Sequence, residues 1–97
     1  MTLIYKIVPD ELWRKAAAIG IFAGSAVDRQ DGFIHFSDAE SVGETARRHF
    51  SGQKNLLLVA VWAARLGSDL KWEPSRGGTL FPHLYAPLQM SAVAWVF

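Results

Sequence analysis

Residues 33–37 contain the first of two histidine segments whose side chains could carry chemistry. In an extended strand, His35 and Ser37 would share one face and apolar residues the other. Histidine is the side chain best suited to proton transfer near neutral pH, so a cleft at the end of this strand could use it. The structural alternative is a core or surface His35 beside a Ser37 that caps the next helix. Ser37 is not expected to be a nucleophile, because the G-x-S-x-G motif is absent.

Residues 81–88 form the second histidine segment. His83 and Tyr85 are two residues apart, so in an extended segment they point the same way, and two prolines stiffen the chain. The prolines favour an edge strand or an ordered loop. We predict that His35, His83 and Tyr85 converge on one cleft. The alternative is an amphipathic edge strand whose imidazole and phenol groups face water.

Two kinds of charged side chain add to this set. Glu73 stands at the end of a short predicted strand, before the Gly-rich residues 74–78, where a site carboxylate is reasonable and an exposed strand end is the alternative. Arg47 and Arg48 lie late in a predicted helix, where they oppose the helix dipole. One of them suffices for that role, so Arg48 could bind a phosphate or carboxylate.

Composition limits the kinds of function. The 97 residues contain no cysteine, which excludes disulfides, thiolate catalysis and cysteine-bound metals. His35, His83 and Glu73 could in principle form a zinc site, but the sequence contains no zinc-binding motif, so no metal is predicted. The net charge of +1 and one basic pair make nucleic acid an unexpected partner. The longest apolar run, residues 56–64, is too short to span a membrane. Lack of cysteine and of a signal-peptide pattern predicts a cytoplasmic protein.

The elements that must position these groups follow from periodicity and turn residues. A hydrophobic content of 51% supplies a core for one domain, residues 1–97. Residues 21–30 are predicted to be a connecting loop, and Ser37 with Glu40 fits a capping box for the second helix. The strand at 56–62 is apolar on both faces, so we expect it to be central. The predicted elements are strands at 3–8, 33–36, 56–62, 70–73 and 92–97, and helices at 10–19 and 38–50. This order predicts an α+β fold with two helices on a mixed or antiparallel sheet.

The order of these motifs resembles the bacterial "domain of unknown function 952" family over essentially the whole chain. The matching residues are Ile4-Tyr5, Trp13, residues 32–37, Trp72-Glu73 and residues 81–88. Lys6 stands where the family usually has His, and Ala86 where it usually has Gly. More remotely, the order resembles the NAD-binding lobe of the RNA 2′-phosphotransferases, in which a Val-His-Leu-Ser segment corresponds to residues 34–37 here.

That remoter resemblance implies an ADP-ribosyltransferase-like split sheet with NAD as substrate in a cleft. The implied activity is ADP-ribosyl transfer or NAD cleavage, in which a carboxylate stabilises positive charge on the ribose. The implied catalytic residues are Glu73, His35 and His83, and the implied ligand-binding residues are Lys6, Ser37, Arg48 and Tyr85. The alternative is a non-catalytic module that binds a small anionic ligand or a protein partner. An enzyme requires Glu73 near both histidines around an open cleft.

Overall fold

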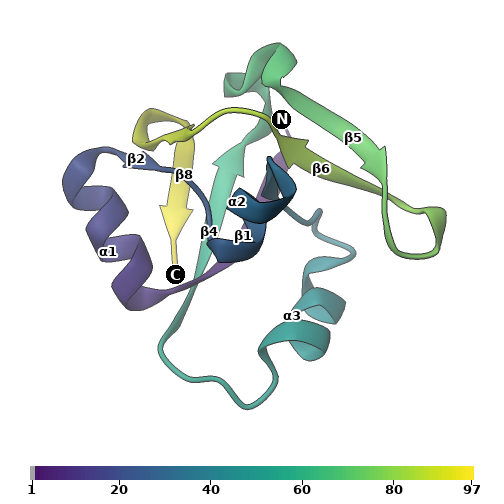
Figure 1. The fold of residues 1–97 in the computed structure, drawn as a ribbon, viewed down its shortest axis with the longest axis horizontal. Helices are drawn as coiled ribbons and strands as arrows, with labels where there is room; N and C mark the ends of the chain where they lie inside the picture. The colour runs from purple at the N-terminus through teal and green to yellow at the C-terminus, as the bar shows by residue number, and fades with distance from the viewer. Residues whose placement is uncertain (1) are drawn as a thin grey trace.

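In a computed structural model, the described part of the chain forms three antiparallel sheets and three α-helices (Figure 1). The structure describes residues 2–97, and Arg76 by its backbone alone. The elements are β1 Leu3–Pro9, α1 Asp10–Ile19, β2 Ile21–Phe22, α2 Ala26–Asp31, β3 Ile34–His35, α3 Val42–Phe50, β4 Leu56–Trp62, β5 Leu70–Pro74, β6 Leu80–Leu84, β7 Leu88–Gln89 and β8 Val93–Val96. The α+β class is therefore confirmed, with one helix more than the sequence predicts.

The largest sheet has the order β1-β4-β8, and its middle strand is β4, as predicted. Val59, Ala60 and Val61 of β4 are fully buried, which is the environment that a strand apolar on both faces requires. The helix α1 contacts this sheet through Trp13 and Ala16, which lie one turn apart on its buried face. In Figure 1, α1 and the β5–β6 pair lie on opposite sides of β1 and β4.

A second three-stranded sheet has the order β3-β6-β5, and it contradicts the prediction that residues 81–88 form an edge strand or loop. Its middle strand β6 contains Pro82, which has no N–H to donate. The Pro82 carbonyl accepts from Phe36 N at 3.0 Å, on the side of β3. The N and carbonyl of one residue point to the same side of a strand, so the missing N–H falls just beyond the short β3 ladder. No hydrogen bond to β5 is lost.

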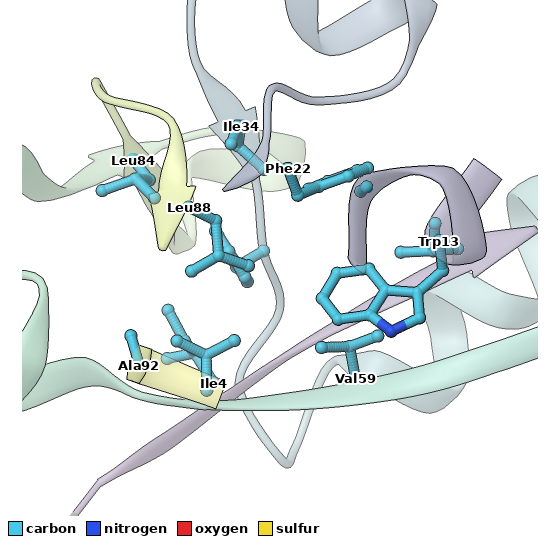
Figure 2. Packing of buried hydrophobic residues seen from close by; sticks show 12 residues of the cluster. Ile4, Trp13, Phe22, Ile34, Val59, Leu84, Leu88 and Ala92 are labelled. Carbon is cyan, nitrogen blue, oxygen red and sulfur yellow. The ribbon is translucent and has the colours of Figure 1, made fainter. Parts of the chain in front are cut away.

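A hydrophobic core joins the sheets (Figure 2). It combines Ile4 and Val59 of the β1–β4 pair with Trp13 of α1, and the rings of Trp13 and Phe22 lie 5.6 Å apart. Leu84 of β6 is also fully buried in this cluster. The sheet that carries the two histidines is therefore anchored to the main sheet by apolar burial.

The prediction of a loop at residues 21–30 is wrong, because these residues contain β2 and the helix α2. Ser25 is the N-cap of α2, with its hydroxyl near Asp28 N and its own N–H donating to the Asp28 carboxylate. This is a capping box with aspartate in place of glutamate. Gly24 has φ of +106°, and a β-carbon there would lie 2.7 Å from Asp28 Cβ. Glycine is therefore required directly before this cap.

The prediction that Ser37 caps the second long helix is also wrong. The helix α3 begins at Val42, after a turn in which Asp38 accepts from both Ser41 N and Ser41 Oγ. Ser37 lies on the far side of this turn, and its hydroxyl is 3.0 Å from Thr45 Oγ1. Asp38, which bonds its own backbone more readily than serine, takes over the start of the helix. No helix within residues 2–97 is long and apolar enough to cross a membrane.

The position of Gly24 gives a stability prediction. Gly24→Ala should lower the free energy of unfolding by about 3 kcal/mol, because it combines a left-handed backbone with a clash against a buried side chain. Gly67→Ala is the matched control, since Gly67 has φ of +60° and its added β-carbon would meet no atom within 4 Å. It should cost about 1 kcal/mol. Equal losses in urea denaturation would contradict the role assigned to the Gly24–Asp28 contact.

Candidate functional site

A cleft of about 850 Å³ opens beside β1, α2, β3, α3 and β6. Part of its lining is apolar, from residues such as Val8, Leu12 and Phe36. The polar side chains that line it are Tyr5, Lys6, Ser25, Asp28, His35, Ser37, Thr45, Arg48, His49, Ser75 and His83. Five of these carry or can take a positive charge and one is an acid, so basic groups outnumber acids in the lining.

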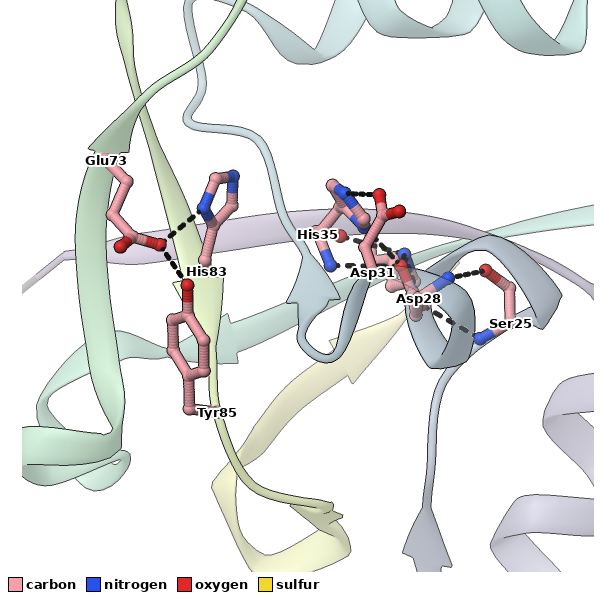
Figure 3. A network of polar contacts seen from close by, with 8 residues as sticks. Ser25, Asp28, Asp31, His35, Glu73, His83 and Tyr85 are labelled. Atoms are coloured by element: carbon pink, nitrogen blue, oxygen red, sulfur yellow. Dashed lines mark hydrogen bonds and ion pairs between the residues drawn. The ribbon is translucent and has the colours of Figure 1, made fainter.

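The acid is Asp28, whose carboxylate is buried and surrounded by donors (Figure 3). Its Oδ1 accepts from His35 N at 3.1 Å and lies 2.7 Å from His35 Nδ1. Its Oδ2 accepts from Ser25 N at 2.8 Å and lies 3.0 Å from Lys6 Nζ. One carboxylate therefore ties together β1, the cap of α2, and β3.

The groups around the Asp28–Lys6 ion pair shift the pKa values of both residues. Burial by itself would raise the pKa of Asp28, but the hydrogen bond from His35 and the charge of Lys6 outweigh it and hold that pKa well below its usual range. Burial lowers the pKa of Lys6, and the attraction of Asp28 only partly opposes this. The effect of burial on the pKa is outweighed at Asp28, because several donors bond to its carboxylate. It is not outweighed at Lys6, which has only Asp28 and the His35 carbonyl, 2.8 Å away, as partners among the described residues.

His35 is held at both ring nitrogens. Nδ1 faces Asp28, and Nε2 lies 3.0 Å from an oxygen of Asp31, three residues further along α2 than Asp28. A carboxylate can only accept in such a contact, so both nitrogens must donate for both contacts to be hydrogen bonds. The ring is about one third exposed and also lines the cleft. Its geometry is that of a donor to its surroundings.

The strand register brings the second histidine to the first. His35 of β3 is paired directly with His83 of β6, and directly paired residues share one face of a sheet. Their ring centroids are 5.5 Å apart. His83 is 5% exposed, and its Nδ1 lies 2.8 Å from Glu73 Oε1. Phe33 stacks on the His83 ring at 4.1 Å and fixes its plane.

Glu73 binds His83 and Tyr85 through the same oxygen. The Tyr85 hydroxyl donates to Oε1 at 2.6 Å. The hydrogen bond from Tyr85, followed by that from His83, lowers the pKa of Glu73, and the same Tyr85 bond raises the pKa of Tyr85. Glu73 and Tyr85 do not line the cleft, but Glu73 contacts His83, which does, and Tyr85 is bonded to Glu73.

The structure thus places the residues of the predicted site in two groups, one around the two histidines and one formed by Ser37 and Arg48. His35 and His83 meet at the cleft, while Tyr85 lies beside them, 5.1 Å from the ring of Phe33. Ser37 and Arg48 line the same cleft, with Ser37 bonded to Thr45 and Arg48 Nε donating to Glu44 at 3.1 Å. Within residues 2–97, no group of three potential ligands is placed to hold a metal ion.

Sequence reasoning missed Asp28 and Asp31, which lie within and directly after the residues 21–30 that it predicted to be a loop. The available signal was the spacing Ser25-x-x-Asp28, which is a capping pattern, together with the glycine before it. Long-range partners such as Lys6 leave no such signal in one sequence.

We predict that Asp28→Asn lowers the free energy of unfolding by about 3–5 kcal/mol, the usual cost of removing one partner from a buried ion pair. The amide would place an NH₂ group against the existing donors and leave the Lys6 charge without a counterion. Asp31→Asn, at an acid that is 44% exposed, should cost about 1 kcal/mol or less. Chemical denaturation measures both, and a small loss for Asp28→Asn would contradict the central role of this carboxylate.

The lowered pKa of Asp28 also predicts a pH dependence of stability. Below about pH 4 the unfolded chain takes up a proton at Asp28 that the folded protein does not. The stabilisation is therefore complete above that range and is lost as the pH falls through it. Denaturation midpoints between pH 6 and pH 2.5 should fall less steeply for Asp28→Asn than for Asp31→Asn. Parallel slopes would show that another acid is responsible.

Comparison with known proteins identifies relatives of this chain. Residues 7–96 match the family described as protein of unknown function (DUF952). The chain is similar to the crystal structure of protein CC0527 from Caulobacter crescentus, with 57% identity, a TM-score of 0.96, and coverage of 99% of this chain and 84% of that chain. The solution NMR structure of CC0527 gives 58% identity, a TM-score of 0.89, and coverage of 100% and 84%. No curated protein matches. This chain, with its two histidine segments facing each other across β3 and β6, belongs to the DUF952 family.

Proposed function

We propose that this protein binds a small phosphorylated ligand of the nucleotide type in the cleft, with NAD as the substrate class to test first. The observation that carries the proposal is the charge of the cleft lining. Lys6, Arg48 and three histidines line the cleft together with one acid, Asp28, whose two oxygens are already engaged. An anion is the ligand that such a surface attracts.

Arg48 is the residue best placed to hold a phosphate. It lies on the exposed wall formed by α3, and only its Nε is used in the contact with Glu44. The terminal nitrogens of a guanidinium form the fork that binds phosphate oxygens in pairs. Lys6 and Ser37 add donors on the β1 side of the cleft.

The contact between Glu73 and His83 favours catalysis over binding alone. An imidazole oriented by a carboxylate is a common arrangement for moving protons during bond cleavage. With the remote likeness to ADP-ribosyltransferases, this pair supports ADP-ribosyl transfer or NAD cleavage as the reaction. Glu73, 2.8 Å from His83 Nδ1, would then stabilise the positive charge that develops on the imidazole as it takes up a proton.

The binding proposal predicts that ADP-ribose and NAD raise the melting temperature of the protein, because a ligand of the native state stabilises it by mass action. Nicotinamide, which has no phosphate, should not. Arg48→Ala should weaken ADP-ribose binding at least tenfold in calorimetry. Arg14→Ala is the matched control, since Arg14 forms the same kind of exposed helical contact, with Asp10, and does not line the cleft. Equal affinities for the two variants would remove Arg48 from the site.

The catalytic proposal predicts nicotinamide release from NAD by the purified protein. Glu73→Gln should abolish release while changing ligand affinity less than tenfold, or about 1.4 kcal/mol. Glu11→Gln, at an exposed acid of α1, should leave release unchanged. If the unmodified protein binds NAD and releases no nicotinamide above background, catalysis fails and the binding module stands.

A further inference from the structure

The two neighbouring histidines differ in what their ring nitrogens contact. Each has Nδ1 within 2.8 Å of a carboxylate oxygen, from Asp28 for His35 and from Glu73 for His83. The difference lies at Nε2. His35 Nε2 meets Asp31, whereas His83 Nε2 forms no hydrogen bond or ion pair with any of the described side chains.

The contact with Glu73 fixes which nitrogen of His83 carries the proton. A carboxylate can accept and cannot donate, so Nδ1 must hold the hydrogen. In the neutral ring, Nε2 is then an acceptor. The ring is nearly buried, its plane is set by Phe33, and the residue lines the cleft. A free acceptor nitrogen on a fixed ring in a cleft is the arrangement of a general base.

His35 cannot take this role while Asp28 and Asp31 occupy both of its nitrogens as acceptors. Each of its ring nitrogens lies within 3.0 Å of a carboxylate oxygen, which can accept a hydrogen bond and cannot donate one. The two rings therefore have opposite hydrogen-bonding character, although they are paired residues of adjacent strands, 5.5 Å apart. Different surroundings that separate two similar groups in this way assign them different roles.

We infer that His83 presents Nε2 to the cleft as the proton acceptor for a hydroxyl or water molecule beside the bound ligand, held in that form by Glu73, while His35 acts only as a donor. This inference rests on the proposed function. When the oxygen attacks the ribose carbon that bears nicotinamide, its O–H bond breaks and the proton passes to Nε2. A C–O bond forms, and the electron pair of the ribose–nicotinamide bond leaves with neutral nicotinamide. Glu73 then faces the imidazolium and stabilises it.

Nuclear magnetic resonance of the ¹⁵N-histidine-labelled protein tests the inference directly. Long-range ¹H–¹⁵N correlations distinguish the tautomers, and His83 should show a protonated Nδ1 and an unprotonated Nε2. His35 should show a hydrogen on Nδ1, which faces Asp28. Addition of ADP-ribose, which carries a ribose hydroxyl at the former nicotinamide position, should shift the His83 Nε2 resonance and leave its Nδ1 bonded. A His83 with its hydrogen on Nε2 overturns the inference.

Two variants separate positioning from general packing. Glu73→Ala should let the Nε2–H tautomer of His83 appear, because the acceptor for Nδ1 is gone. Tyr85→Phe removes the other donor to the same Glu73 oxygen and should leave the tautomer unchanged. If ADP-ribose moves amide resonances around Lys6 and Ser37 but not Nε2, the inference fails and the binding proposal stands. If ADP-ribose and NAD shift no resonance, the proposed function fails. The tautomer of His83 in the free protein then decides by itself whether Nε2 is an acceptor.

Discussion

The Asp28 carboxylate is the constraint on which the rest of the site depends. It lies in a six-residue helix, which is too short to be stable on its own. Its oxygens contact Lys6 from β1, the backbone of Ser25, and both the backbone and ring of His35. A buried charge costs free energy unless it is paired and hydrogen-bonded, and here each oxygen has at least two partners. The same contacts that satisfy Asp28 therefore fix one wall of the cleft.

The other fixed part of the site is the sheet β3-β6-β5. Its register sets His35 opposite His83, and along β5 and β6 it sets Glu73 opposite Phe81, so that His83 and Glu73 lie diagonally on adjacent strands. Diagonal neighbours are within reach of long side chains such as glutamate. The chemistry-bearing residues are thus placed by backbone pairing rather than by loops, which gives them precise positions.

The sequence predicts well the parts of this protein that depend on local pattern. The strand at 56–62 and the helix at 10–19 follow from apolar periodicity and capping glycine, and both are confirmed. Alternation in the two histidine segments predicts a cleft shared by His35, His83 and Tyr85. The prediction holds for the two histidines, which line the cleft, and is wrong for Tyr85, which does not. The errors arise where patterns compete. Ser37 fits a capping box, but Asp38 forms the turn before the helix instead. Pro82 is a residue that disfavours a central strand, yet β6 is central, because β3 is too short to need the N–H that Pro82 lacks.

The least constrained side of the cleft is α3. This helix has no buried residue, and a shallow apolar groove of Val42, Gly43 and Ala46 separates part of it from Leu57 and Phe97. One wall of the cleft thus depends on the Asp28 ion pair and its hydrogen bonds, where substitutions lower stability. The other wall is α3, where substitutions remove almost no buried contacts from the core. In descendants of one ancestor, such a division lets the machinery stay constant while the accepted ligand diverges. Changes of specificity in relatives of this protein should accumulate along α3 at residues other than Arg48, and should leave Gly24, Asp28 and His35 unchanged.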